Sequence, residues 1–250
     1  MMPLYEAKML HLYDTRWATY EPDGTTRGMT EEEKARHLAP LPRYWVAESE
    51  IDRKLAGRWK NQWFLGWRDI CRATDARTVI ATASPRVGYG DKWLLALPRR
   101  GRHSLQATWS SFALDYCARQ KIGGTSMKFF TFMQLPMPRP ESFEDRSMLD
   151  RSASQWISLR VDRLNGWIPD PDERAQVRAE LDALMFHVYG LGRDDASYVL
   201  DTFPIVKRKD EAAFGSYRTK ELILAAYDAL AEAEASGTPY CAPWKQEVHS

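Results

Sequence analysis

The stretch SFALDYCARQKIGG, residues 111–124, joins a helical apolar pattern to a basic, polar segment that ends in two glycines. Apolar helices seldom continue into such a segment unless the chain turns sharply, and glycine permits backbone conformations that other residues avoid. The expected turn presents bare backbone N–H groups together with three long donor side chains, those of Arg119, Gln120 and Lys121. Backbone N–H groups gathered in a turn attract anions, so an anion is the natural ligand.

One continuous helix is expected before this turn. Ser104 suits its cap, and apolar residues recur near a 3.6-residue period at Leu105, Trp109, Phe112 and Tyr116. After the turn, the aromatic run FFTFMQL at residues 129–135 indicates a strand. Prolines at positions 136, 138 and 140 then form a stiff exit, which is the clearest boundary in the chain.

The two sides of this boundary differ in pattern. Residues 1–139 contain a capping box at Thr30 and Glu33, a turn at 88–91, and strand-like runs at 44–47, 63–70, 77–83 and 92–97. Residues 140–250 contain helical apolar stripes at 149–164, 171–188 and 219–235, the second with Asp170 as cap, Pro171 at its first position and Glu173 closing a capping box. The expected fold class is α+β: a mixed-sheet recognition domain over 1–139 and a mainly helical C-terminal part over 140–250.

Bulk composition restricts the class of protein. The 250 residues contain no run of about 20 apolar residues, which a membrane span requires. Glu6 and Lys8 come early and no apolar signal core accompanies them, so no secretion and no membrane partner are expected. The three cysteines are few, odd in number and widely spaced, at positions 71, 117 and 241, which is typical of reduced thiols in a cytoplasmic protein.

Charge is distributed unevenly along a chain whose formal net charge is only +1. Residues 51–139 carry 16 Lys/Arg and 5 Asp/Glu, a net charge of +11. Residues 140–205 carry 7 Lys/Arg and 13 Asp/Glu, a net charge of −6. A concentrated basic surface is the electrostatic pattern that nucleic-acid backbones select. The alternative is that these cations face acidic neighbours within the fold.

Several motifs occur together and in order along nearly the whole chain: LYEAKM at 4–9, YDTRWATY at 13–20, GWRDI at 66–70, TDART at 74–78, ARQKIGG at 118–124, DTFPIVKRKDE at 201–211 and GSYRTK at 215–220. With them the chain resembles the C-terminal target-recognition region of Eco57I-type, type IIG-like adenine-N6 DNA methyltransferases of restriction-modification and phage-defence systems. The resemblance implies sequence-specific binding of double-stranded DNA. It also implies that S-adenosylmethionine binds a catalytic domain that lies N-terminal to this region in the family.

Catalytic motifs of that family do not occur in the chain. Adenine-N6 methylation requires an Asn/Asp-Pro-Pro-aromatic segment for the flipped base, and the chain has no Pro-Pro pair. Gly88 and Gly90 fall in an expected hairpin turn and do not predict a cofactor loop. Glu6 and Lys8 match only half of a metal-dependent nuclease motif. The five histidines lack metal-ligand spacing, and no Gly-x-Ser-x-Gly elbow is present. We expect no cofactor, metal or methylation activity in this chain alone.

The candidate DNA-binding residues are basic or lie beside the glycine pair: Arg68, Arg72, Arg77, Arg119, Gln120, Lys121, Gly123, Gly124, Lys128, Lys207, Arg208, Lys209, Arg218 and Lys220. Arg pairs with guanine, Gln with adenine, and Lys with phosphate or guanine. Structural roles are the alternatives. Arg119 and Lys121 could neutralise a helix C-terminus, residues 207–209 could be a solvated loop, and Arg68, Arg72 and Arg77 could pair with Asp69 and Asp75.

Two functions follow from these observations. The first is a DNA target-recognition domain that positions the target adenine for a methyltransferase catalytic domain or subunit absent from this chain. The second is a protein-interaction module, which uses the acidic residues 140–205 to dock a methylase or defence-system subunit and has no independent affinity for DNA.

Overall fold

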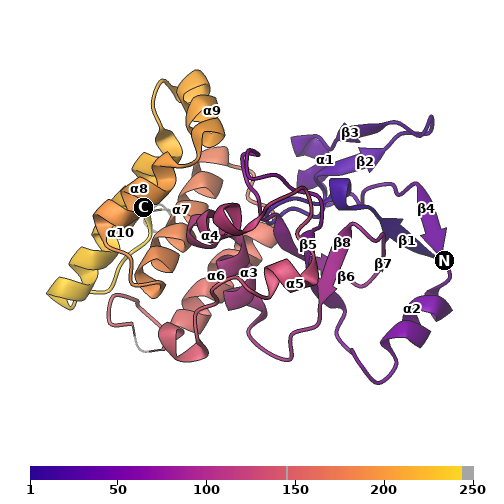
Figure 1. The fold of residues 1–250 in the computed structure, drawn as a ribbon, viewed down its shortest axis with the longest axis horizontal. Helices are drawn as coiled ribbons and strands as arrows, with labels where there is room; N and C mark the ends of the chain where they lie inside the picture. The colour runs from indigo at the N-terminus through magenta and orange to yellow at the C-terminus, as the bar shows by residue number, and fades with distance from the viewer. Residues whose placement is uncertain (145, 244–250) are drawn as a thin grey trace.

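The fold is α+β, with strands in the N-terminal part and a mainly helical C-terminal part (Figure 1). The computed structural model describes residues 1–144 and 146–243. The strands are β1 (Met2–Tyr5), β2 (Ala18–Tyr20), β3 (Thr26–Gly28), β4 (Tyr44–Val46), β5 (Trp63–Arg68), β6 (Ala81–Pro85), β7 (Gly88–Tyr89) and β8 (Trp93–Ala96). The helices are η1 (Ala7–Met9), α1 (Glu31–Ala35), α2 (Glu48–Leu55), α3 (Arg102–Ser110), α4 (Phe112–Lys121), α5 (Phe129–Phe132), η2 (Pro140–Phe143), α6 (Ala153–Gly166), α7 (Pro171–Val188), α8 (Arg193–Asp201), α9 (Pro204–Phe214) and α10 (Arg218–Ser236).

Three small sheets make up the N-terminal part. The central sheet has the order β6-β5-β8 and is antiparallel throughout, with Leu65 opposite both Ala83 and Ala96. A mixed sheet has the order β4-β1-β7, in which β1 runs antiparallel to β4 and parallel to β7. The hairpin β2-β3 forms the third sheet. Of the expected strands, 44–47, 63–70 and 92–97 are confirmed as β4, β5 and β8, and the run 77–83 forms a strand only from Ala81. The predicted turn at 88–91 opens with β7.

The core of the central sheet is aromatic. Trp67 of β5 stacks on Phe132 at a centroid distance of 4.1 Å and meets Trp109 edge to face. Its indole N–H donates to the Met127 carbonyl at 2.8 Å. The stacking of Phe132 on Trp67 explains why the strand predicted at residues 129–135 is wrong. The predicted strand is a single helical turn, α5, which delivers Phe132 to the buried face of the sheet.

The expected continuous helix before the glycine pair is two helices, α3 and α4, broken at Ser111. Ser111 has an extended backbone, and its hydroxyl accepts from the Leu114 amide while donating to the Thr108 carbonyl at 2.8 Å. The cap therefore lies at Ser111, and Ser104 lies inside α3. The break lets α3 pack against α6 while α4 packs against α7 and α8. The helical layer consequently begins at Arg102, before residue 139.

The C-terminal helices follow the sequence pattern closely. Asp170 caps α7 with Pro171 at the first position, and the predicted apolar stripe of α7 is buried. Glu173 does not close a capping box, because it pairs with Arg163. Helices α8 and α9 of this part were not predicted. Helix α9 carries residues 207–209, for which a solvated loop was the alternative to DNA binding. None of the helices in residues 1–144 and 146–243 has the length and apolar character needed to cross a bilayer.

Candidate nucleic-acid interface

Arg119, a candidate base-reading residue of the segment 111–124, points into the fold. Its side chain is only 8% exposed. It donates to the carbonyls of Asp75 and Ala76 and to the Thr202 carbonyl at the end of α8, and its guanidinium lies 3.9 Å from the centre of the Phe203 ring. Burial lowers the pKa of Arg119. The guanidinium holds α4 against two neighbouring segments, so Arg119 is a structural residue and not a base-reading one.

Arg77 and Arg68 are also internal. Arg77 donates to the buried carboxylate of Asp115 at 2.7 Å and to the Ser110 carbonyl at 2.6 Å. Arg68 donates to the carbonyls of Ala7 and Leu10, and burial lowers its pKa. Asp115, and not Asp69 or Asp75, is therefore the carboxylate that organises this basic segment. Its two oxygens also accept from the Thr78 amide at 3.0 Å.

The glycine pair does not form the expected anion-binding turn. Neither Gly123 nor Gly124 has a positive φ, and an added Cβ would meet nothing within 4 Å at either position. The pair follows the C-terminal end of α4, where the orphan groups are carbonyls and the helix dipole is negative. An anion is disfavoured there. Gln120 and Lys121 remain exposed beside it.

Four other candidate cations have carboxylate partners. Lys128 lies 2.7 Å from Asp69, Arg218 lies 2.8 Å from Asp172, Lys220 lies 2.7 Å from Asp201, and Lys207 lies 3.9 Å from Glu211. Exposed ion pairs such as Lys207–Glu211 contribute about 0–1 kcal/mol to stability, whereas Lys128 pairs with the fully buried Asp69. All four pairs reduce the local positive charge, so these residues contribute less to a basic surface than the sequence implies. Arg208 and Lys209 are exposed on α9.

The structure identifies a different set of exposed cations. Within residues 51–139, eight exposed Lys/Arg have no carboxylate partner among the described residues: Lys54, Arg58, Lys60, Arg72, Arg99, Arg100, Lys121 and Arg139. Only Arg72 and Lys121 of these were selected from the sequence. The net charge of residues 51–139 predicts exposed cations in this block, but it does not show which of them lack a carboxylate partner.

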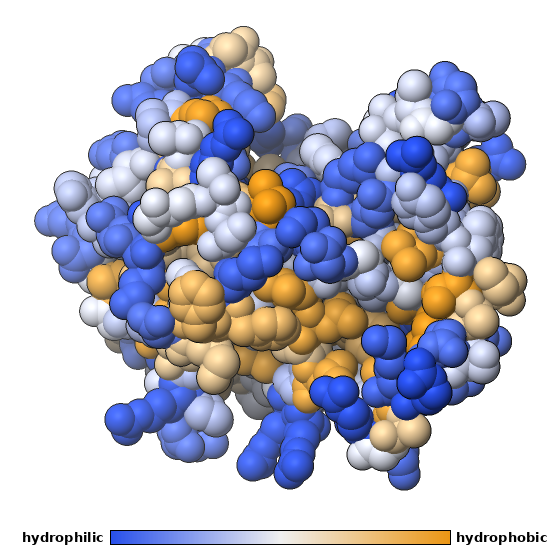
Figure 2. Space-filling view, turned by 45° about the vertical axis from the view of Figure 1, so that its right-hand side comes forward, coloured by the Kyte–Doolittle hydropathy of each residue, from blue (hydrophilic) through white to orange (hydrophobic). Residues whose placement is uncertain are grey.

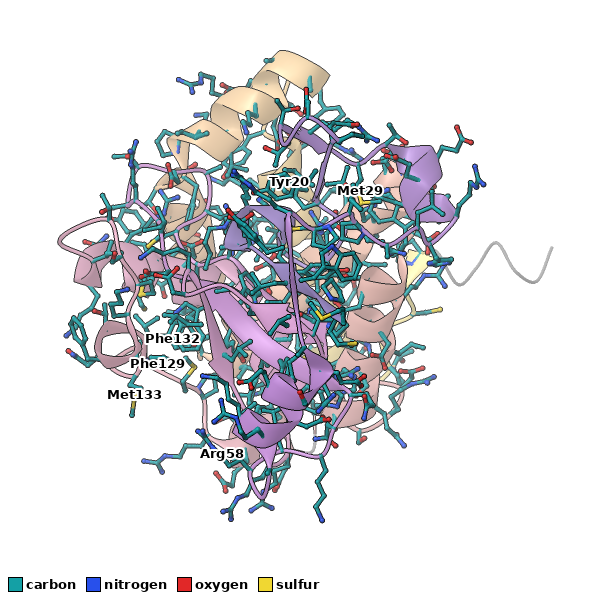
Figure 3. All side chains as sticks on the ribbon, turned by 90° about the vertical axis from the view of Figure 1, so that its right-hand side faces the viewer. Tyr20, Met29, Arg58, Phe129, Phe132 and Met133 are labelled. Atoms are coloured by element: carbon teal, nitrogen blue, oxygen red, sulfur yellow. The ribbon has the colours of Figure 1, made fainter. Side chains whose placement is uncertain are left out.

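Five of these cations gather at one end of the central sheet. In the antiparallel register, Trp63 at the start of β5 lies opposite Pro85, and Leu65 lies opposite Ala96 at the end of β8. The segment before β5 and the loop after β8 therefore emerge at the same end. The first carries Lys54, Arg58 and Lys60, and the second carries Arg99 and Arg100. We call these five residues the basic end; Figure 3 shows Arg58 at the lower edge of the molecule.

Side-chain contacts hold the segment between α2 and β5 in place. The Trp59 indole donates to the Trp63 carbonyl at 2.6 Å, and the two rings meet edge to face at 4.9 Å. Arg86, which follows β6, pairs with Asp52 of α2. The segment between α2 and β5 is thus fastened on both sides of Arg58. Ordered cations lose less conformational entropy on binding than cations on a free loop.

A groove at the opposite end of β5 brings two of the predicted residues together. Arg68 and Arg72 line this groove, of about 610 Å³, with Lys8, Lys92 and Tyr44. Acidic residues line it as well, namely Glu6, Asp75 and Asp91. Its charge is therefore mixed, in contrast to the basic end.

The predicted set as a whole does not form one surface. Helix α9, which carries Arg208 and Lys209, lies at the top of the molecule in Figure 1, and the basic end lies toward the bottom. A single straight duplex that touches the basic end would have to span the molecule to reach α9. The residues of α9 and of the start of α10 are consequently separated from the main basic surface.

Exposed apolar side chains form a second surface feature around α5. Phe129, Phe130, Met133 and Met137 are all exposed, with Phe130 at 69% and Met133 at 80%. Figure 2 shows an apolar band across the middle of this face, and Figure 3 shows Phe129 and Met133 at the edge of the molecule. We call these four residues the apolar ledge. Exposed apolar patches commonly mark surfaces that bind other molecules.

Comparison with known proteins gives no independent identification, because no protein-family model, curated protein or solved structure matches the chain. Within residues 1–144 and 146–243, no cluster of three or more His, Cys, Asp or Glu could hold a metal ion.

Proposed function

We propose that the chain binds double-stranded DNA as the target-recognition part of an adenine-specific DNA methyltransferase in a cytoplasmic restriction-modification or phage-defence system. The basic end supplies the phosphate contacts. The observation that carries the proposal is the convergence of five exposed, unpaired cations from two separate segments on one end of the central sheet. Catalysis and S-adenosylmethionine binding belong to a separate catalytic domain or subunit.

Electrostatics favours this role. Cations without carboxylate partners keep their full field at the surface and release condensed counterions from DNA when they bind phosphate. The groove beyond the other end of β5 adds donors for base edges, because the Arg72 guanidinium is exposed there. Arg can pair with guanine O6 and N7, so Arg72 is the best remaining candidate for base recognition. Gln120 and Lys121 are exposed on α4 and remain secondary candidates.

The direct test is the salt dependence of duplex binding by the chain itself. Fluorescence anisotropy with a labelled duplex should give an affinity that falls linearly with log salt. If the basic end makes roughly five phosphate contacts, the slope should be about −4 to −5. The absence of binding at low salt, or a slope near zero, would contradict the proposal.

A second function is favoured by the apolar ledge. The chain would then be a protein-interaction module that docks a methylase or defence-system subunit and has no independent DNA affinity. The two proposals separate in one experiment, in which Phe130→Ser and Met133→Ser are introduced together. A docking module loses co-purification with its methyltransferase subunit, and a DNA-binding domain keeps its duplex affinity.

A further inference from the structure

A small cavity lies between the N-terminal segment and the C-terminal helices, away from the basic end. Its volume is about 230 Å³, below the range typical of drug-sized ligand sites. Residues His11 to Tyr13, the α3–α4 junction, and helices α7, α9 and α10 all contribute to its wall. Apolar side chains provide most of the lining, including Phe112, Val206, Leu222 and Ile223. The cavity therefore suits a ligand with a small apolar body.

One charged group in the wall is Arg178 of α7. It donates to the Leu12 carbonyl at 3.3 Å, a long hydrogen bond, while its Nε is buried and has no partner among the described residues. Arg178 has no carboxylate within 4 Å in the part of the chain that the structure describes. Burial lowers the pKa of Arg178, because nothing nearby compensates fully for the loss of water. A half-buried guanidinium in this state can accept an anionic partner.

Two further charged groups line the cavity, Arg77 and Asp182. Arg77 is already paired with Asp115 at 2.7 Å, whereas Asp182, one helical turn beyond Arg178 on α7, has no ion-pair partner among the described residues. Its side chain accepts from the Phe112 amide at 2.8 Å through Oδ1, and its Oδ2 makes no hydrogen bond within the described residues. The residue is 8% exposed, and burial raises the pKa of the carboxyl to about 6. Near neutral pH the carboxylate is largely charged, so a cationic donor at Oδ2 would stabilise it.

Arg178 and Asp182 do not neutralise one another. Side chains four residues apart on a helix are neighbours, with Cβ atoms about 5–6 Å apart, and opposite charges at this spacing commonly pair. Arg178 instead turns toward Leu12 and Asp182 turns toward Phe112. A cation and a carboxylate, each with unused hydrogen-bonding capacity, thus line the same cavity. Unpaired buried charges are costly, and a ligand of complementary charges would remove that cost.

Backbone strain at the cavity wall supports a binding role. Tyr13 has a φ of 57°, a left-handed conformation that is unfavourable for a side chain of its size. Hydrogen bonds between His11 and Asp14, at 2.7 and 3.0 Å, hold this turn closed. The turn brings the Leu12 carbonyl to Arg178 and the Tyr13 ring to the cavity. Strained residues of this kind cluster at ligand-binding sites.

We propose that the cavity binds a free α-amino acid with an apolar side chain, whose carboxylate faces Arg178 and whose ammonium group faces Asp182. A zwitterion is the smallest common ligand that satisfies both groups and adds no net charge to a buried site. A monocarboxylate would satisfy Arg178 alone and bring a second anion near Asp182. An alkylamine would satisfy Asp182 alone and bring a second cation near Arg178.

Calorimetric titration of the chain with free leucine, isoleucine, valine, methionine and phenylalanine tests the proposal. At least one should bind, and its analogues that lack either the amino group or the carboxyl group should bind at least roughly tenfold more weakly, since each loses one charged contact. Failure of all five to bind at millimolar concentration, or an acid analogue that binds as tightly as the amino acid, would overturn it.

Asp182→Asn provides the sharper comparison, because an Asn side chain can still accept from the Phe112 amide. The amino acid should lose at least roughly tenfold in affinity, whereas its carboxylate-only analogue should not weaken. Equal weakening of both ligands, or of neither, would contradict the assignment of the ammonium group to Asp182. Arg174→Met, one turn earlier on α7 and outside the cavity, is the matched control and should leave both affinities unchanged.

Discussion

At the scale of single residues, Asp115 determines where Arg77 and Arg119 point. Its carboxylate is completely buried and binds Arg77 at 2.7 Å, with Arg119 at 3.5 Å. A buried carboxylate requires such partners, because its charge is otherwise too costly to remove from water. Two arginines that looked suitable for DNA are thereby committed to the fold.

Arg119→Ala should reduce stability and leave DNA affinity unchanged once the protein is folded. The substitution removes donors from three backbone carbonyls and the contact with Phe203, at a cost of roughly 1–3 kcal/mol. Urea unfolding measures the stability, and duplex anisotropy below the unfolding midpoint measures affinity. Loss of duplex affinity without loss of stability would return Arg119 to the DNA-binding surface.

Gly124→Ala should be neutral or stabilising by up to about 1 kcal/mol, because the position has an ordinary φ and open space for a methyl group. Gly66→Ala is the contrasting variant. A Cβ at Gly66 would lie 2.8 Å from the Leu94 carbonyl oxygen and 2.3 Å from the Trp93 indole nitrogen, so the central sheet should be destabilised. Thermal unfolding compares the two. A large loss of stability in Gly124→Ala would show that the glycine pair does have a conformational role.

At the scale of elements, the long helices are the most predictable from the sequence. Helices α7 and α10 have apolar residues at helical spacing, clear stop signals and, for α7, an Asp-Pro start, and these features are local. The strand predicted at 129–135 is wrong because five aromatic or apolar residues in a short run fit either a strand or a helix. The conformation of α5 depends on the contact of Phe132 with Trp67, which is distant in sequence.

The residues of the candidate site are harder to predict from the sequence than the helices are. The +11 block was evident from composition, but the choice of residues within it followed motifs. Arg99 and Arg100 belong to no motif and become prominent only because β5 and β8 pair in a register that brings their loop to the end of the sheet where β5 begins. Conversely, Arg77 is removed from the surface by Asp115, 38 residues away in sequence.

Helix α7 should show a pH-dependent contribution to stability through Asp182. Its pKa is about 6 in the fold, above the ordinary value of 3.8, so the folded state binds the proton more tightly. Stability from this group is greatest at low pH and falls as pH rises from about 4 to 6. Asp182→Asn should therefore be more stable than the parent above pH 6, by up to roughly 3 kcal/mol, with the difference shrinking below pH 4. A difference in unfolding free energy that does not vary with pH would contradict this account.

At the scale of the whole molecule, the net charge of +1 conceals a polarised surface. Internal pairing neutralises part of the basic block, and the remaining charge is concentrated at the basic end. Helix α9 lies toward the opposite end of the molecule, whereas α3 begins just after Arg100 (Figure 1). The fold thus separates the basic end from α9.

The most direct measurement compares two variants that each remove two positive charges from exposed positions. Arg99→Gln with Arg100→Gln alters the basic end, and Arg208→Gln with Lys209→Gln alters α9. We predict that the first variant binds duplex DNA more weakly at low salt, with a slope of log affinity against log salt that is less negative by about 1–2. The second variant should resemble the parent. Equal effects of the two variants, or a larger effect of the α9 variant, would contradict the assignment of DNA binding to the basic end.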